Sequence, residues 1–279
     1  MLKKSRAVIV LAGVGAALAA AAPAVAQPTW APADDAAIAP GNMTFTDGGQ
    51  CTSNFVFFDR SDNVYLGQAA HCAGTGESTD TDGCETGSLP LGTKVEVEGA
   101  QEPATLAYSS WRTMQDVGET DDDTCAFNDF ALIKLDRADA AEVNPSIPFF
   151  GGPTALGADT RPGQKVLSLG NSSLRLGLDL LRPKVGTSLG EAGDGWTHNV
   201  LTVTPGVPGD SGSAFIDRDG RAFGVLSTLQ LAPLAGSNGV SDLRKAVNYM
   251  EAHGGPQVNL ARGTEESSRG GLLGRLLRR

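Results

Sequence analysis

The sequence is poor in the features that bind nucleic acid or hold a metal ion. Only 22 of its 279 residues are Lys or Arg, against 32 Asp and Glu, and the formal net charge is −10. An acidic surface repels phosphate groups, so we do not expect a nucleic-acid partner. No Cys-x-x-Cys pair occurs. Zinc is therefore the weaker interpretation of the cysteines, and we expect neither a metal nor a cofactor.

Apolar runs long enough to cross a membrane are missing after residue 26. The chain begins with three cations within residues 1–6, continues with an apolar run over 7–22, and then has the small residues Ala24 and Ala26. This order is typical of a secretory signal peptide cleaved after Ala26. A transmembrane anchor is the alternative, but it needs roughly 20 apolar residues. We expect a secreted, extracellular protein without a stable membrane span, and a monomer.

The chain has only four cysteines, and an even number in an exported chain indicates two disulfides. Four cysteines allow three pairings, and their positions alone do not choose among them. The cysteines are Cys51, Cys72, Cys84 and Cys125.

Glycine and proline are abundant, at 36 and 15 residues, as is typical of many tight turns between short strands. Apolar residues 55–58 and 64–66 flank a polar turn and predict a hairpin, and residues 93–98 alternate as a strand does. Only one helix is predicted, from a cap at Ser241 to the stop at 254–256. The pattern predicts an all-β barrel or sandwich.

Proline and glycine are concentrated in residues 144–163, which we interpret as the link between two halves. Residues 105–111 are expected to form a strand, and the acidic residues 115–125 a solvated loop. The predicted segments are a signal peptide (1–26), an N-terminal arm or short pro-segment (27–40), a first half (41–150), a second half with the helix (151–261), and a basic flexible tail (262–279). A short amphipathic segment that touches acidic polymers is the alternative for the tail.

Histidine is scarce, with three residues in the chain, so few groups can serve as a general base. Hydrolysis by a nucleophilic hydroxyl needs such a base, a carboxylate that orients it, and donors for the oxyanion. His253 follows the predicted helix and is interpreted as a surface residue, and His198 as structural. His71 comes directly after a predicted strand and before Cys72. Taken alone, His71 is better explained by a structural role.

Two further segments carry groups of the required kinds. Ser211 has Gly209 and Gly212 close by, and glycine allows a substrate to approach the backbone closely. The N–H groups of Gly209 and Ser211 could both point at one oxyanion. Asp129 precedes the apolar run 130–135. Taken alone, the segment around Ser211 is an ordinary turn, and Asp129 is a strand-capping residue. Taken together, however, His71, Asp129 and Ser211 occur in this order along the chain, each at the edge of a predicted strand.

Together, residues 69–72 (AAHC), 129–135 (DFALIKL) and 209–213 (GDSGS) resemble the motifs of the chymotrypsin-like serine proteases. The resemblance covers residues 41–253 and is closest to secreted actinobacterial members. It implies two six-stranded antiparallel β-barrels, with a C-terminal helix and the active site between the barrels. It implies that His71 is the general base, Asp129 its orienting carboxylate and Ser211 the nucleophile, with the Gly209 and Ser211 N–H groups as the oxyanion hole.

The resemblance also implies how substrate is bound. Thr204 and Pro205 would line one wall of the specificity pocket, and Ser227 and Leu229 the other, with Ser227 also supporting Asp129. No acid lies at the base of this pocket, so we expect small or medium apolar residues before the cut rather than Lys or Arg. The resemblance implies a disulfide between Cys51 and Cys72, and with it one between Cys84 and Cys125.

One family feature is missing. The chain has no Ile-Val-Gly-Gly terminus to pair with the acid before the nucleophile, which here is Asp210. We expect Asp210 to find another donor, for which an arginine is the candidate. The sequence thus predicts a serine endopeptidase that cleaves polypeptides through an acyl-enzyme. A non-catalytic binding module on the same fold and an esterase with the same triad are the alternatives.

Overall fold

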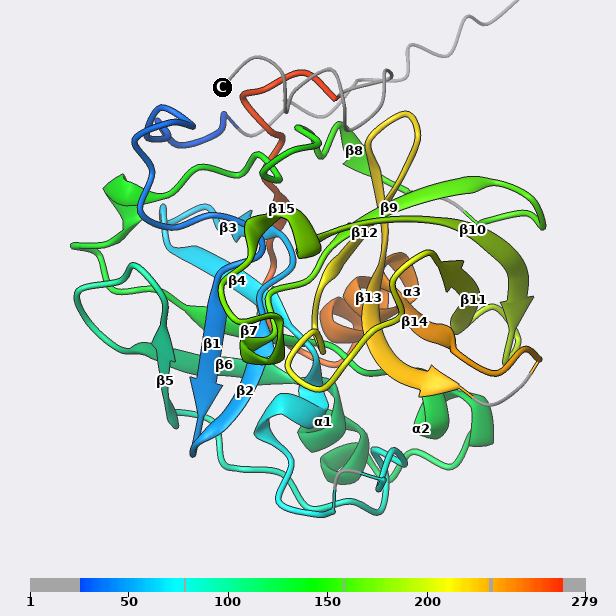
Figure 1. Cartoon of the computed structure of the whole chain (residues 1–279). Helices are drawn as coiled ribbons and strands as arrows, with labels where there is room; N and C mark the ends of the chain where they lie inside the picture. Colours follow the sequence, from blue (N-terminus) through cyan, green and yellow to red (C-terminus); the bar gives the residue numbers. More distant parts are fainter. Residues whose placement is uncertain (1–25, 78, 158, 231–232, 268–279) are drawn as a thin grey trace, which may run out of the picture.

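The computed structural model describes residues 26–77, 79–157, 159–230 and 233–267 (Figure 1). The predicted signal peptide before Ala26 and the predicted tail from residue 268 onward lie outside the described residues. Among the described residues, no helix has both the length and the apolar character needed to span a bilayer.

The first sheet contains eight antiparallel strands and curls into a half-barrel, on the left of Figure 1. Strand β2 continues through residues 53–55 into β3, so strands far apart in the sheet order are consecutive in the chain. Ser53 donates its N–H to Asn42, next to β1, and Asn54 donates its own to Gly67 in β4. In sheet order the strands are β15 (Asn259–Leu260), β3 (Val56–Phe58), β4 (Val64–Gln68), β7 (Ala131–Lys134), β6 (Ala104–Ser109), β5 (Lys94–Val97), β1 (Met43–Thr46) and β2 (Gly49–Thr52).

The second sheet, on the right of Figure 1, closes on itself because its first strand, β12, also pairs with β13. Six antiparallel strands form this ring, and the short β8 adds to β13 in parallel. The predicted all-β fold of two barrels is therefore confirmed. The second barrel has the six strands that were predicted, whereas the first sheet has eight. In sheet order the strands are β12 (Ala214–Asp217), β9 (Lys165–Leu169), β10 (Pro183–Ala192), β11 (Thr197–Thr202), β14 (Ser237–Asp242), β13 (Arg221–Gln230) and β8 (Ala155–Leu156).

The two barrels share part of their apolar core. Phe57 and Phe130 of the first half belong to one buried cluster with Ile216 and Val225 of the second, and Met250 of the C-terminal helix joins them. Burial of apolar side chains is the main force that holds packed layers together. The shared cluster therefore fixes how the two barrels pack against each other, and the predicted site lies where they meet.

The predicted C-terminal helix is present as α3 (Leu243–Ala252), but its cap differs from the prediction. Asp242, not Ser241, caps the helix by accepting a hydrogen bond from the Lys245 N–H at 2.7 Å. The Ser241 hydroxyl is engaged elsewhere, because it accepts a hydrogen bond from the N–H of Asp129 at 3.2 Å. Both residues are good caps by type, and the sequence pattern did not register this competing contact.

Residues 110–127 contain two helices that the sequence did not predict, α1 (Ser110–Val117) and α2 (Asp122–Phe127). The prediction of a strand over 105–111 holds only as far as Ser109, and the prediction of a loop over 115–125 is wrong. Trp111 is buried on the inner face of α1. Asp121 caps α2 by accepting from the Thr124 N–H at 2.8 Å. Part of the acidic segment therefore caps and begins a helix instead of forming a loop. The 3-10 turns are η1 (Ala70–Ala73), η2 (Ala140–Glu142), η3 (Ser173–Arg175) and η4 (Asp179–Leu181).

Both described ends of the chain pack on the first barrel. In the N-terminal arm, Ile38 is fully buried and bridges to Val143, and the Trp30 ring meets Phe58 edge-on. Strand β15 pairs with β3, although its residues lie in the segment assigned to the second half. The domain boundaries read from the sequence remain a prediction, and the backbone pairing of β15 crosses them.

The two capping aspartates differ in what else they hold, which predicts different costs of removal. Asp242 also contacts Nε2 of the fully buried His198 at 2.8 Å. We expect Asp242→Ala to lower the free energy of unfolding by about 3 kcal/mol, because a cap and a buried partner are lost together. Asp121→Ala removes only a surface cap and should cost distinctly less. Urea unfolding measures both, and equal losses would contradict the role given to the His198 contact.

Candidate active site

His71 and Asp129 lie side by side at the cleft. His71 is in η1, directly after β4, and Asp129 lies between α2 and β7. Nδ1 of His71 is 2.7 Å from Oδ2 of Asp129, and the His71 N–H donates to Oδ1 of the same carboxylate at 2.9 Å. One carboxylate therefore fixes both the backbone and the ring of the histidine. Such a contact leaves Nε2 of the ring as the nitrogen that can accept a proton.

Asp129 is buried, and its carboxylate receives one further hydrogen bond, from the second barrel. The Ser227 hydroxyl donates to Oδ2 at 2.6 Å. Burial alone raises the pKa of the Asp129 carboxyl, but the charge and hydrogen bonds of His71 and the bond from Ser227 outweigh it and hold the pKa below its ordinary 3.8. Asp129 is thus an anion at neutral pH.

The histidine responds to this anion. Burial alone lowers the pKa of His71, but the charge of Asp129 and its hydrogen bond raise it by more, so that the pKa lies above its ordinary 6.5. The His71 side chain keeps 26% of its surface exposed, so the ring is open to the cleft. A partly exposed imidazole of raised pKa suits a general base that gains and returns a proton.

The loop that carries Ser211 lies against the strands that lead to His71. The Ser211 carbonyl accepts a hydrogen bond from the Thr52 N–H at 2.8 Å. Gly212 has φ +87°, and a Cβ there would lie 2.5 Å from the Thr52 carbonyl and 3.0 Å from the Ala69 nitrogen. Glycine is therefore required for this close approach. Within the described residues no hydrogen bond joins the Ser211 hydroxyl to His71, so the third contact of the predicted triad stays a prediction.

The backbone around Ser211 presents two unused donors. In the described part of the chain, the N–H groups of Gly209 and Ser211 donate to no acceptor. The Gly209 carbonyl on the far side is held by the Thr52 hydroxyl at 2.7 Å and by the Gln50 amide at 3.2 Å. Gly209 has φ +94°, which L side chains rarely adopt. Free, fixed donors of this kind fit the predicted oxyanion hole.

Asp210 has found the donor that the sequence required. Its carboxylate accepts hydrogen bonds from Nε and Nη2 of Arg175, and the prediction of an arginine partner is therefore confirmed. A second cation, Lys184, lies with Nζ 2.8 Å from Oδ2 and was not foreseen. Lys184 lies in strand β10, and no motif in the sequence distinguishes it from a surface lysine.

The two predicted walls of the specificity pocket are neighbours in the structure. Asn238 joins them, because its backbone pairs with Leu229 in the sheet and its side chain accepts the N–H of Gly206 at 2.9 Å. Thr204 and Pro205 directly precede Gly206. Asn238 is fully buried and was missed by the sequence analysis, since an Asn between Ser and Gly is typical of a turn.

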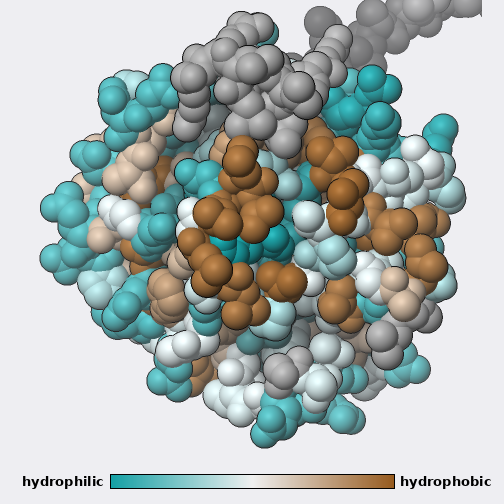
Figure 2. Space-filling view, viewed as in Figure 1, coloured by the Kyte–Doolittle hydropathy of each residue, from teal (hydrophilic) through white to brown (hydrophobic). Residues whose placement is uncertain are grey.

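Apolar side chains are exposed around these walls. Val203 is 85% and Leu229 57% exposed, and the segment with η3 and η4 adds more. Figure 2 shows hydrophobic side chains gathered around a hydrophilic centre on the face seen in Figure 1. The exposed leucines of that segment are Leu174, Leu176, Leu178, Leu180 and Leu181.

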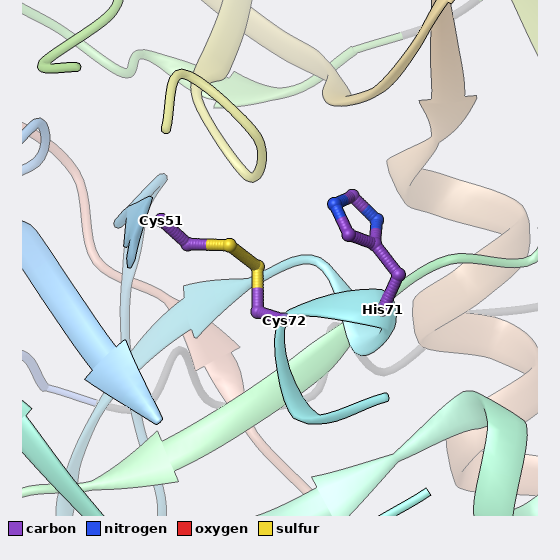
Figure 3. A group of neighbouring side chains, drawn as sticks. All are labelled: Cys51, His71 and Cys72. Carbon is purple, nitrogen blue, oxygen red and sulfur yellow. A yellow bond between two sulfur atoms is a disulfide. The ribbon is translucent and has the colours of Figure 1, made fainter. Parts of the chain in front are cut away.

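The cysteines form the two disulfides that the resemblance implied, Cys51–Cys72 and Cys84–Cys125. Sulfur atoms of the first bond lie close to His71, but Figure 3 shows that Cys72 turns toward Cys51 while the imidazole extends away from η1. Disulfide sulfurs are not thiolates and do not bind zinc. The first disulfide instead anchors the turn that carries His71 to β2.

The remaining histidines lie outside this site. His198 is fully buried between Asp242 and the Thr160 hydroxyl, at 2.8 and 2.9 Å. His253 is exposed after α3, and its ring stacks on Tyr249. Both observations agree with the structural interpretation that the sequence favoured.

Comparison with known proteins identifies the architecture. No protein family and no curated sequence matches the chain. Among solved structures, Thermobifida fusca Protease A aligns with a TM-score of 0.51 and 15% identity, over 81% of this chain and 100% of its own. A glutamic acid-specific serine protease aligns equally well, at TM-score 0.51 and 16% identity, over 80% of this chain and 100% of its own.

The chain has the chymotrypsin-like fold. In this chymotrypsin-like arrangement the histidine and aspartate come from the first barrel, and the serine loop and Ser227 come from the second. At such low identity the likeness establishes the fold and leaves the activity to be argued from the site itself.

The contact between Asp129 and His71 predicts a measurable titration. We expect NMR titration to give His71 a pKa above 6.5 in the wild-type protein, with the ring charged below that pH. In Asp129→Asn the attraction is lost while burial remains, so the pKa should fall below the wild-type value. The exposed Asp62→Asn is the control and should leave it unchanged. An Asp129→Asn protein with the wild-type pKa would remove the carboxylate as the cause.

Proposed function

We propose that this protein is a serine endopeptidase that acts outside the cell. The observation that carries the proposal is the hydrogen-bonded array of Ser227, Asp129 and His71 beside a loop with a serine and two free N–H donors. Each part has a place in acyl transfer: an oriented base, a hydroxyl and an oxyanion site. The fold shared with known serine proteases supports this use of the site.

The proposed reaction has two halves. The Ser211 hydroxyl attacks the peptide carbonyl carbon and gives its proton to Nε2 of His71. The carbonyl oxygen becomes an anion that the N–H groups of Gly209 and Ser211 stabilise. His71 then returns the proton to the leaving amine, which breaks the C–N bond and leaves an acyl-enzyme. Water, deprotonated by His71, releases the acid and restores Ser211.

The proposed preference is for small or medium apolar residues before the cut. Thr204, Pro205 and Leu229 offer no charged partner, and Leu229 is exposed beside them. The glutamic acid-specific protease of the comparison binds substrate through a histidine triad. This chain has three histidines in all, and one of them is His71, so it cannot assemble such a triad beside a catalytic histidine. Acidic side chains are therefore not the proposed substrate.

Export is supported by two observations. Residues 1–26 are typical of a signal peptide, and all four cysteines are paired in disulfides. Disulfides persist mainly in oxidising compartments. We accordingly propose that the protein acts on polypeptides outside the cell.

Labelling with a fluorophosphonate probe tests the proposal. The wild-type protein should become labelled, because the oxygen of an activated serine displaces fluoride from the phosphorus of the probe, and Ser211→Ala should not. The exposed Ser61→Ala is the control and should label as the wild type does. If a correctly folded wild type stays unlabelled, the fold serves as a non-catalytic binding module. If it labels and cleaves esters but no peptide, the protein is an esterase.

A further inference from the structure

We propose that Lys184 is a positioning residue that ties the oxyanion loop to the wall of the substrate pocket and binds a surplus positive charge to that loop. The proposal rests on the proposed function of this site. It concerns a residue outside the triad, in β10 of the second barrel.

All three protons of the Lys184 ammonium have acceptors. Nζ lies 2.8 Å from Oδ2 of Asp210, and it donates to the Pro205 carbonyl at 3.0 Å and to the Thr204 carbonyl at 3.4 Å. The side chain is fully buried. One ammonium group therefore joins the residue between the two oxyanion donors to the two residues predicted to line the pocket.

Asp210 does not need Lys184 for its own neutralisation. Arg175 already binds both carboxylate oxygens. The N–H groups of Ser172 and Val207 donate to the same oxygens, each at 3.1 Å. Two cations thus face one anion, and in the described residues no other carboxylate contacts either cation. One positive charge is left over.

The surplus charge is bound to the loop on which a negative charge would develop. Asp210 stands between Gly209 and Ser211 in the chain, so both cations are anchored to the residue that joins the two donor N–H groups. Gly170, at the end of β9, makes the approach possible, since a Cβ there would lie 2.3 Å from Asp210 Oδ1 and 2.9 Å from Lys184 Cε. A fixed charge in a site of low dielectric constant stabilises an oxyanion more than it could in water.

A buried lysine is costly, and an apolar residue would fill the same space without the loss of hydration. Burial lowers the pKa of Lys184 below its ordinary 10.5, and Arg175 adds to this, although Asp210 opposes it. Asp210 and Arg175 are the titratable groups that face the ammonium among the described residues. The charge should therefore be lost at a less alkaline pH than that of a surface lysine, and oxyanion stabilisation should be lost with it.

The test compares rates of fluorophosphonate labelling across pH. Lys184→Met keeps the length of the side chain and removes its charge, and we expect labelling about tenfold slower, or more, at neutral pH. Lys184→Arg keeps the charge and should recover most of the rate. The wild-type rate should fall on the alkaline side, and this fall should be absent in Lys184→Met. The exposed Lys165→Met is the control and should behave as wild type.

The outcomes separate the two proposals. A labelled wild type with an equally fast Lys184→Met overturns the role of Lys184 and leaves the proposed function standing. The role of Lys184 is also overturned if Lys184→Arg is labelled slowly and Lys184→Met shows the same fall in rate at alkaline pH as the wild type. In that case the substitutions have disturbed only the packing. A folded wild type that never labels overturns both. If Lys184→Met fails to fold, two measurements still test the role of Lys184: the fall of the wild-type labelling rate at alkaline pH, and the labelling rate of Lys184→Arg.

Discussion

The structure depends on one buried carboxylate, that of Asp129. Removing an anion from water is costly unless hydrogen bonds replace its hydration. Asp129 obtains these bonds from His71 on its own barrel and from Ser227 on the other, while its N–H is held by Ser241. The carboxylate is therefore satisfied only when both barrels are docked. Folding of the two halves and assembly of the site are thus one event.

A second set of constraints shapes the serine loop. Thr52 binds this loop at two points, through its N–H to Ser211 and through its hydroxyl to Gly209. Behind the loop, Asp210 is anchored to Arg175 and Lys184, which belong to the second barrel. The loop is thereby fixed from both sides of the cleft. The Gly209 and Ser211 N–H groups can therefore stay without an acceptor in the protein, because the bonds to Thr52 and Asp210 hold the loop backbone in place.

The sequence predicted those parts of the site that depend on short motifs. His71, Asp129 and Ser211 each stand in a distinctive local context. The fold brings the first two into contact and places the loop that carries Ser211 against Thr52 and Ala69, in the segments that lead to His71. The hairpin of β3 and β4 and the helix α3 followed from apolar spacing and turn residues. These features are local, so a single chain reveals them.

The rest depended on contacts between residues far apart in the chain. Asp242 replaced Ser241 as the helix cap because Ser241 is bound by Asp129, more than a hundred residues away. Lys184 and Asn238 look ordinary in sequence, and only their burial against the serine loop and pocket walls gives them a role. Helix α1 formed where a strand was expected, because Trp111 finds a buried site beside His71.

The return of β15 to the first barrel has a topological consequence. Among the described residues, the chain runs from the first barrel to the second and returns to the first, where the Ala261 N–H also donates to the Val56 carbonyl. Cleavage of one peptide bond within the connecting residues 144–163 would therefore leave two fragments that stay associated. The β15–β3 backbone hydrogen bonds and the shared apolar core would hold them together. The backbone pairing of β15 and the shared apolar core therefore both oppose separation of the two barrels.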